Sequence, residues 1–401
     1  MFKKSLVAVA VLGTAAGFAC AADVTLYGKA DAGLVYTNTK TTSSEDATVK
    51  AHQFGLESGV NSASRFGLKG TEDLGNGLKV GFNLENGFNV DDGALGNGGR
   101  LFGREASLSV SGDFGTLSAG RMGGVGSGAG TYSLFTGIAD AFDGGNVDVF
   151  GLVTTERYDN MLTYQTPKFA GVQATFQYSF KGNNKEDKDL QDKGFYDPAT
   201  GREGSAATDR YASVGLTGDF GALQTVLTYE YLNYASNNGA DLRNKDIQNG
   251  QILSLGGNYD CGFAKTFIAA QYFKDLAFSE DTITGYIQDT DATKPGNQEY
   301  EGVSYGKGYA LALGTIVPVA GGDLTTAVYY RDADLEWDAF QGEKDTAKYT
   351  GVTVKYEYPL SKRTSVYTGA GFGQEKIESK ADSYEAKQKL YQAFVGMTHS
   401  F

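Results

Sequence analysis

Several residue types are scarce in this chain of 401 residues, and their scarcity excludes some classes of protein. The chain has 5 prolines, 4 methionines and 1 tryptophan, and it has no run of 18 consecutive apolar residues. A helix that spans a membrane needs about 20 predominantly apolar residues. The sequence therefore contains no candidate for a transmembrane helix.

The residue clusters that catalysis and metal binding require are also missing. The two histidines, His52 and His399, lie far apart in the sequence, and no metal-binding or catalytic cluster is evident around either. The glycine-rich segment 123–130 lacks the Lys-Ser or Lys-Thr pair of a phosphate-binding loop, so we interpret it as a flexible loop. We predict that the protein is not an enzyme and has no cofactor or metal site.

Positive charge is in deficit. The chain has 35 lysines and arginines against 48 aspartates and glutamates, which gives a net charge of −13 at pH 7. Binding to nucleic acid phosphates needs clustered lysines and arginines. The composition therefore argues against nucleic acid as a partner.

The first 22 residues have the pattern of a secretory signal peptide. Lys3 and Lys4 precede an apolar stretch from Leu6 to Phe18, and small residues at 19–22 suit signal peptidase. The apolar stretch is too short to span a bilayer as a helix. We expect an exported protein, which leaves a soluble secreted fold or a closed barrel.

The cleavage site and the state of the cysteines follow from the same segment. Cleavage after Ala22 would leave residues 23–401 as the mature chain, and cleavage after Ala21 fits equally well. A lipid anchor on Cys20 is an alternative that the residues before it do not favour. The mature chain retains one cysteine, Cys261, so we predict a turn residue and no intramolecular disulfide.

The most regular feature of the sequence is alternation with a period of two residues. From Val24 to Tyr36 the even positions are apolar or small, whereas the odd positions include Lys29 and Asp31. A strand projects alternate side chains to opposite faces. The same pattern recurs at 65–69, 78–88, 172–180, 224–231 and 352–358. The sequence predicts strands with one apolar face and one polar face.

Short and long connections alternate between these strands. The short, glycine-rich ones are 73–77, 112–115, 166–171, 218–221, 260–262 and 359–363, and the long, polar ones are 37–63, 181–210, 275–306 and 373–387. Short turns on one side and long loops on the other are typical of outer-membrane barrels. Most strands run about 9 to 13 residues, enough to cross the apolar layer. We predict an all-β, antiparallel transmembrane barrel of sixteen strands, the first near Val24–Tyr36 and the last near Leu390–Phe401.

The composition and the last residues agree with a barrel. The chain contains 56 glycines, 25 tyrosines and 24 phenylalanines, and aromatic residues favour strands and membrane interfaces. Alternate residues from Tyr391 to Met397 are apolar, and the chain ends on Phe401. This ending resembles the C-terminal signal that barrel-assembly machinery reads, so we assign Phe401 to assembly.

Several motifs resemble the general porin family of Gram-negative bacteria such as Neisseria and Burkholderia. They occur in the family's order and reach both ends of the mature chain. They are DVTLYG at 23–28, SRFGLKGTEDLGNGL at 64–78, GDFGTLSAGR at 112–121, the segments 159–164 and 167–171, and YPLSKRT at 358–364. The resemblance implies a barrel, usually trimeric, whose third long loop folds into the lumen.

In this chain that third loop should run from Met122 to Thr155, and the resemblance places basic residues on the wall opposite it. We expect the constriction to contain Asp140 and Asp143 on the loop, with Lys29 and Arg65 on the wall. Arg121 matches an arginine of the family motif, although strict alternation turns it outward, so a bulge or a strand end must intervene. Family members often carry arginine at Thr163, and its absence weakens the expectation of anion preference.

The resemblance implies a water-filled channel for passive diffusion of small hydrophilic solutes and ions. The expected partners are outer-membrane lipid and lipopolysaccharide, the barrel-assembly machinery and two further copies of the chain. An outer-membrane adhesin or receptor that acts through its long loops is the alternative. A barrel hydrolase is a weaker one, because the chain lacks a histidine constellation.

Overall fold

The structure is a computed structural model that describes residues 23–43, 48–142, 149–181, 209–233, 249–278, 304–337, 344–379 and 384–401. The predicted signal peptide, residues 1–22, lies outside this part of the chain. The elements in chain order are β1 (Asp23–Ser43), β2 (Thr48–Ser58), β3 (Arg65–Gly75), β4 (Leu78–Gly87), α1 (Gly96–Gly99), β5 (Glu105–Gly112), β6 (Gly115–Gly123), α2 (Phe135–Ala139), β7 (Arg157–Gln165), β8 (Val172–Ser179), β9 (Arg210–Phe220), β10 (Leu223–Asn233), β11 (Gly250–Asp260), β12 (Lys265–Phe278), β13 (Ser304–Val319), β14 (Gly322–Trp337), β15 (Lys344–Pro359), β16 (Thr364–Ser379) and β17 (Tyr384–Ser400). Among the described residues, no helix is both long and apolar enough to cross a membrane.

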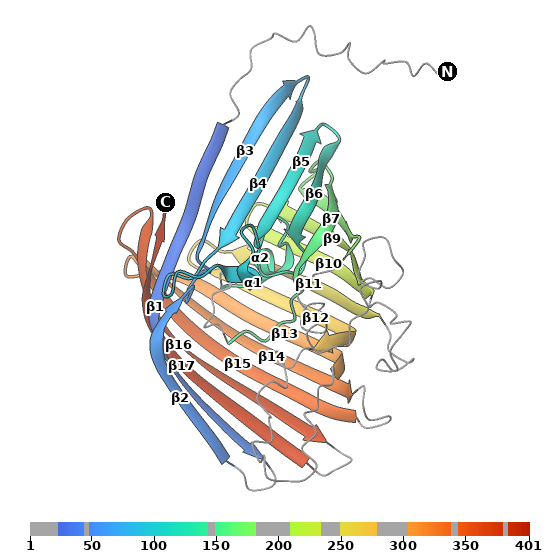
Figure 1. The fold of residues 1–401 in the computed structure, drawn as a ribbon. Helices are drawn as coiled ribbons and strands as arrows, with labels where there is room; N and C mark the ends of the chain where they lie inside the picture. Colours follow the sequence, from blue (N-terminus) through green and yellow to red (C-terminus); the bar gives the residue numbers. More distant parts are fainter. Residues whose placement is uncertain are drawn as a thin grey trace, which may run out of the picture.

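The strand segments of the described chain form one antiparallel sheet that closes on itself (Figure 1). Closure comes from the pairing of β1 with β17, in which Lys29 lies opposite Ser400 and Ser43 lies opposite Ala386. This pairing removes the two free edges that an open sheet would expose. A closed sheet is the form in which strands can cross lipid, because backbone groups there have no water to bind.

Two of the segments are halves of one strand. Both β2 and β3 run antiparallel to β1, β2 beside residues Ala32 to Thr42 and β3 beside Asp23 to Lys29. Between them, residues 59–64 leave the sheet. The seventeen segments of the described chain therefore make sixteen strands, and the predicted fold class is confirmed.

Two of the connections predicted as long loops are mainly strand. Residues 37–63 supply the end of β1 and all of β2, and 373–387 lie largely in β16 and β17. These segments are mostly polar, and the apolar residues Phe54 and Leu56 of β2 are too few to mark a strand, but their backbones pair with neighbouring strands. The strands are accordingly longer than predicted, up to 21 residues in β1. The other two predicted loops, 181–210 and 275–306, lie mostly outside the described residues.

The short turns follow from residues that tolerate a positive φ. Asn76 and Gly77 have φ values of 54° and 78° between β3 and β4, as a two-residue hairpin turn of type I′ requires. The turn between β13 and β14 was missed by the sequence analysis. It uses Ala320, with φ 51°, and Gly321, with φ 84°, and alanine at such a position gives no turn signal.

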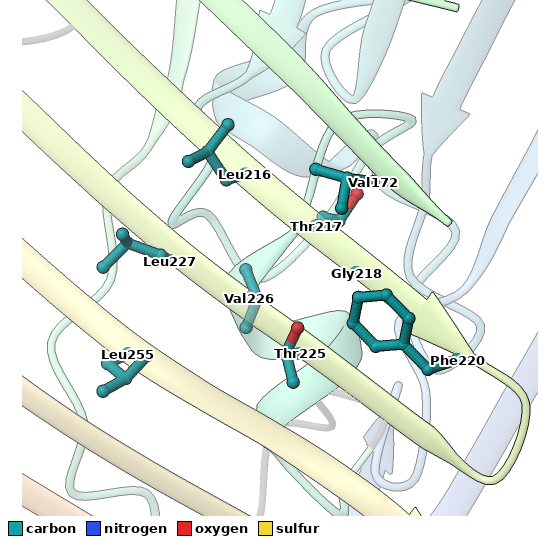
Figure 2. Close-up of a pocket in the computed structure, with 9 residues that line it drawn as sticks. All are labelled: Val172, Leu216, Thr217, Gly218, Phe220, Thr225, Val226, Leu227 and Leu255. Carbon is teal, nitrogen blue, oxygen red and sulfur yellow. The ribbon is translucent and has the colours of Figure 1, made fainter. Parts of the chain in front are cut away.

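The two faces of the sheet differ in polarity as the alternation predicts. On β10, Thr228 is 0% exposed and faces the interior, whereas its neighbour Leu227 is 40% exposed on the outer face. Leu216 of β9 and Leu255 of β11 stand beside Leu227 on the outer surface (Figure 2). The hollow among these side chains therefore lies on the outside of the barrel and does not belong to its lumen.

The last residue helps to close the barrel. The Phe401 N–H donates to the Gly28 carbonyl at 3.0 Å, and the Gly28 N–H donates to the Phe401 carbonyl at 3.1 Å. The Phe401 ring covers Gly28 so closely that a Cβ at position 28 would lie 2.3 Å from Cζ. Phe401 thus joins the end of the last strand to β1. Its role in assembly stays a prediction.

Deleting Phe401 should lower the amount of folded barrel without blocking export. The deletion removes two backbone hydrogen bonds, each with a net contribution of about 1 kcal/mol, together with the ring that covers Gly28. Heat-modifiable mobility of membrane fractions on detergent gels measures the folded fraction. The Phe401→Tyr variant, which keeps the ring and the backbone, is the control. Equal folded fractions for the deletion and the wild type would contradict the prediction.

Candidate functional site

The connection between β6 and β7, residues 124–156 and here called loop L3, turns into the barrel (Figure 1). Within it, α2 contacts β10, β11 and β12. Phe135 and Ala139 of α2 are buried in one apolar cluster with Val226 and Ile252 of the wall. Burial of one phenylalanine side chain contributes about 1.5–3 kcal/mol. The prediction that the third loop folds into the lumen is confirmed for its described residues.

Polar side chains of the wall bind the backbone of L3 at several points. Gln271 of β12 accepts from the Val153 N–H at 2.7 Å and donates to the Val153 carbonyl at 2.8 Å. Asn258 of β11 donates to the Ile138 carbonyl at 2.7 Å. Sequence reasoning missed both residues, because the alternation in β11 and β12 is blurred by apolar residues on both faces.

The glycines at the start of L3 serve close packing, which corrects the interpretation of a flexible loop. A Cβ at Gly124 would lie 2.6 Å from the Tyr211 hydroxyl, and a Cβ at Gly126 would lie 2.1 Å from Oε1 of Glu230. No side chain fits at either distance. Glycine at these two positions therefore lets the L3 backbone approach the barrel wall.

Lys29 and Arg65 lie together on the wall. They are opposite each other in the ladder between β1 and β3. Lys29 Nζ donates to Ser62 Oγ at 3.0 Å, and Arg65 donates to the same oxygen at 3.3 Å and to the Ala63 carbonyl at 2.8 Å. The segment 59–64 that leaves the sheet thus provides acceptors for both cations.

Asp140 lies at the C-terminal end of α2 and is 8% exposed. The Tyr329 hydroxyl of β14 donates to it at 2.8 Å. Burial raises the pKa of Asp140 to about 6, while hydrogen bonds and the charge of Lys355 on β15 act in the opposite direction. Lys355, which sequence reasoning missed, is thus the cation whose field reaches Asp140. Asp143 lies outside the described residues.

Arg121 reaches its position through a bulge. The register of β6 against β7 shifts between Gly120 and Met122, so the backbone departs from strict alternation there, as the sequence required. The Arg121 guanidinium binds Asp159 of β7 at 2.7 Å and the Gly103 carbonyl at 2.8 Å. The structure therefore groups Arg121 with Asp159, whereas Lys29 and Arg65 gather around the segment 59–64.

Arg121 belongs to a set of basic side chains along β3 to β7, here called the arginine row. Its members are Arg65, Arg100, Arg104, Arg121 and Arg157, with the carboxylates Glu85 and Asp159 among them. Each carboxylate serves two arginines: Glu85 lies 2.6 Å from Arg104 and 3.9 Å from Arg65. Arg157 Nε is buried without a hydrogen-bond partner among the described residues. The five arginines outnumber the carboxylates beside them, Glu85, Asp159 and Glu156, so the row keeps an excess of positive charge.

The other candidate residues have local structural roles. His52 lies in the exposed strand β2, and His399 Nδ1 lies 2.9 Å from the Thr364 hydroxyl. Cys261 occupies an exposed turn, where its thiol donates to the Ala264 carbonyl at 3.0 Å. Within the described ranges, no group of three or more histidine, cysteine, aspartate or glutamate residues is placed to hold a metal ion.

The order of the strands places α2 and the basic wall on opposite sides of the lumen. In a closed barrel of sixteen strands, β10 and β11 lie half a turn from β1 and β3. The wall that carries α2 therefore faces the wall that carries Lys29 and Arg65. The lumen is thus bordered by the loop on one side and by two positive side chains on the other. The width of a pore and the charges that line it are what set the selectivity of a channel.

Comparison with known proteins agrees with this architecture. The family described as Gram-negative porin matches residues 8–377. An outer membrane porin protein of Bordetella pertussis is 32% identical over 423 residues, which cover 100% of both chains. The major outer membrane protein P.IB of Neisseria gonorrhoeae is 27% identical over 400 residues, 97% of this chain and 100% of that one.

Solved structures share the fold. The anion-selective porin from Comamonas acidovorans has a TM-score of 0.60 at 25% identity, over 95% of this chain and 100% of that chain. The outer membrane channel DcaP of Acinetobacter baumannii has a TM-score of 0.61 at 16% identity, over 96% and 99%. The family match and the full-length identity to the Bordetella protein show that this chain belongs to the Gram-negative porin family and is a channel of the outer membrane.

Proposed function

We propose that the protein is a homotrimeric diffusion channel for small hydrophilic solutes, with its constriction between L3 and the wall that carries Lys29 and Arg65. The observation that carries this proposal is the position of α2, which packs on β10 to β12 across the lumen from β1 and β3. Passage is passive, and the chain takes part in no reaction. Residues 1–22 act as a signal peptide that is removed on export.

The channel prefers anions, because positive charge predominates on the wall beside the constriction. In the arginine row, two carboxylates serve several arginines, and Lys29 adds a further cation beside Arg65. A related structure at 25% identity is that of an anion-selective porin. Thr163, where family members often carry arginine, is buried and accepts from Gln177. Other arginines of the row supply the positive charge that Thr163 lacks.

The assembly is a trimer held by the outer faces of the first and last strands, in contact with outer-membrane lipid and lipopolysaccharide. The chain enters the membrane through the barrel-assembly machinery, guided by Phe401. Small residues such as Ala30 and Ala32 of β1 allow neighbouring walls to approach closely.

The alternative role of an adhesin depends on long loops that lie mostly outside the described residues.

Substitutions of Arg65 and Asp140 should shift ion selectivity in opposite directions. Arg65→Gln removes a wall cation and should move the reversal potential toward cations. Asp140→Asn removes a loop anion and should move it toward anions, and both shifts should be largest at low salt, where charges are least screened. Planar-bilayer recordings in a salt gradient measure both. Unchanged selectivity in both variants would mean that these residues do not act on the pore.

The selectivity should also depend on pH through Asp140. Its raised pKa of about 6 means that the carboxyl is charged at neutral pH and becomes neutral as the pH falls through 6. Lowering the pH from about 8 to about 5 should therefore increase anion preference, because one lumen anion is lost. The Asp140→Asn variant should lack this change. An equal pH response in the variant would assign the titration to another group.

A bulky residue at Gly137 should narrow the channel. Gly137 is the exposed residue of α2, and a Cβ placed there meets no atom within 4 Å. Gly137→Trp should reduce single-channel conductance and slow the uptake of larger sugars in liposome-swelling assays, because the ring projects into the lumen. Gly55→Trp is the control, since Gly55 is equally open but lies on β2. Equal sugar uptake by both variants would contradict the proposed constriction.

The trimer should depend on the outer face of β1. Ala30→Trp should lower the fraction of particles with the mass of three chains in light scattering, because the ring separates adjacent barrels. Leu216→Trp places the same ring on the outer face of β9, near the opposite side of the barrel, and should leave the mass unchanged. A wild-type particle with the mass of one chain would contradict the trimer.

A further inference from the structure

The two ends of L3 meet at one carboxylate oxygen. Oε2 of Glu230 on β10 accepts from the Gly126 N–H at 3.2 Å, near the start of the loop, and from the Thr155 hydroxyl at 2.6 Å, near its end. The Tyr211 hydroxyl of β9 donates to the same oxygen at 2.6 Å. A single atom of the wall thus binds both ends of the loop.

Glu230 is held by neutral donors alone among the described residues. It is 1% exposed, and its three hydrogen-bond partners are an N–H group and two hydroxyls. A buried carboxylate is costly unless it is hydrogen-bonded, and hydrogen bonds to a charged acceptor are stronger than neutral ones. Moving L3 away from the wall would take the Gly126 and Thr155 donors from this buried carboxylate, and the free-energy cost of that loss opposes the movement.

The packing around Glu230 fixes the contact from both sides. Tyr211 is fully buried and stacks on Tyr158 with ring centroids 4.1 Å apart. The loop ends also bind each other, since the Gly124 N–H donates to the Glu156 carbonyl at 3.0 Å. The two ends of L3, here called its base, are therefore hydrogen-bonded to each other, and Glu230 attaches both of them to the barrel wall.

We propose that Glu230 is the positioning residue that fixes the base of L3 to the barrel wall and thereby keeps the constriction at a constant width. Beyond the base, L3 is held by contacts that lie apart from one another, such as the hydrogen bonds of Gln271 and Asn258 and the packing of Phe135. When the base is released, the loop shifts within the lumen and the channel fluctuates between conductance levels. This inference rests on the proposal that L3 forms the constriction.

The test removes the contact once from the wall and once from the loop. Glu230→Leu leaves three donors without an acceptor, whereas Glu230→Gln keeps a carbonyl oxygen where Oε2 lies. Gly126→Ala places a Cβ 2.1 Å from Oε1 of Glu230 and displaces the carboxylate, whereas Gly128→Ala meets no atom within 4 Å. Each disruptive variant therefore has a conservative partner at the same residue or in the same loop.

Single-channel recordings of the assembled protein measure the time spent in partial conductance levels. We expect Glu230→Leu and Gly126→Ala to raise this time by roughly tenfold, which corresponds to about 1.4 kcal/mol. Glu230→Gln and Gly128→Ala should behave as the wild type.

A structural role alone would lower the thermal stability of the barrel without adding conductance levels. If Glu230→Leu does not fold, the Gly126→Ala and Gly128→Ala pair decides the outcome.

Two outcomes separate this inference from the proposed function. Steady conductance in both disruptive variants, with reduced conductance in Gly137→Trp, would overturn the role of Glu230 and leave L3 as the constriction. Unchanged conductance in Gly137→Trp would overturn the constriction itself. Fluctuation in Glu230→Gln equal to that in Glu230→Leu would also overturn the proposal, because the acceptor oxygen is then not the essential feature.

Discussion

Closure of the backbone hydrogen-bond ladder is the constraint on which the rest of this structure depends. A strand in lipid has no water to satisfy its N–H and C=O groups, and here the pairing of β1 with β17 completes the ladder. Once the sheet is closed, its two faces become the outside and the inside of the barrel, and the period-two alternation assigns each side chain to one of them. The apolar side chains face lipid and the polar ones face an enclosed lumen.

An enclosed polar lumen would be a wide channel if it were empty, but L3 occupies part of it. The loop meets an unusual wall, because β10 to β14 carry buried apolar residues on their inner face, including Ile252 and Phe273. Apolar contacts there and hydrogen bonds from wall side chains hold the loop on one side. Across the lumen from this wall, β1 and β3 carry Lys29 and Arg65 on their inner face, where we propose that the passage lies.

In the arginine row, shared carboxylates neutralise part of the positive charge, whereas Arg331 and Glu375 on the opposite part of the wall form a single pair. Glu85 and Asp159 each serve two arginines, so the arginine row stays positive although every part of it has an anion nearby. Opposite charges at 4 Å interact by about 1 kcal/mol in bulk water and about 4 kcal/mol near a protein surface. The row is therefore stable as a group and keeps the positive charge on which the proposed anion preference depends.

Much of the fold follows from local sequence, because strands and turns are local features. The alternation in segments such as Val24–Tyr36 and turns such as Asn76-Gly77 predicted a barrel of sixteen strands, whereas the inward third loop was implied by the resemblance to the porin family. Alternation also placed Lys29 and Arg65 on the inner face, where the structure pairs them. The ends of the longest strands escaped prediction, since polar residues on both faces carry no alternation and pair only with their neighbours in space.

What the tertiary structure alone decided is which residues meet across the lumen. Asp140 lies in the field of Lys355, more than 200 positions later in the sequence, because L3 crosses to the far wall. Glu230 binds Gly126 and Thr155 for the same reason, and the glycines of the loop pack closely where the sequence indicated flexibility. Such contacts depend on how a closed barrel brings distant strands face to face. No local pattern specifies them, because each side chain alone is simply a polar residue at an inward position.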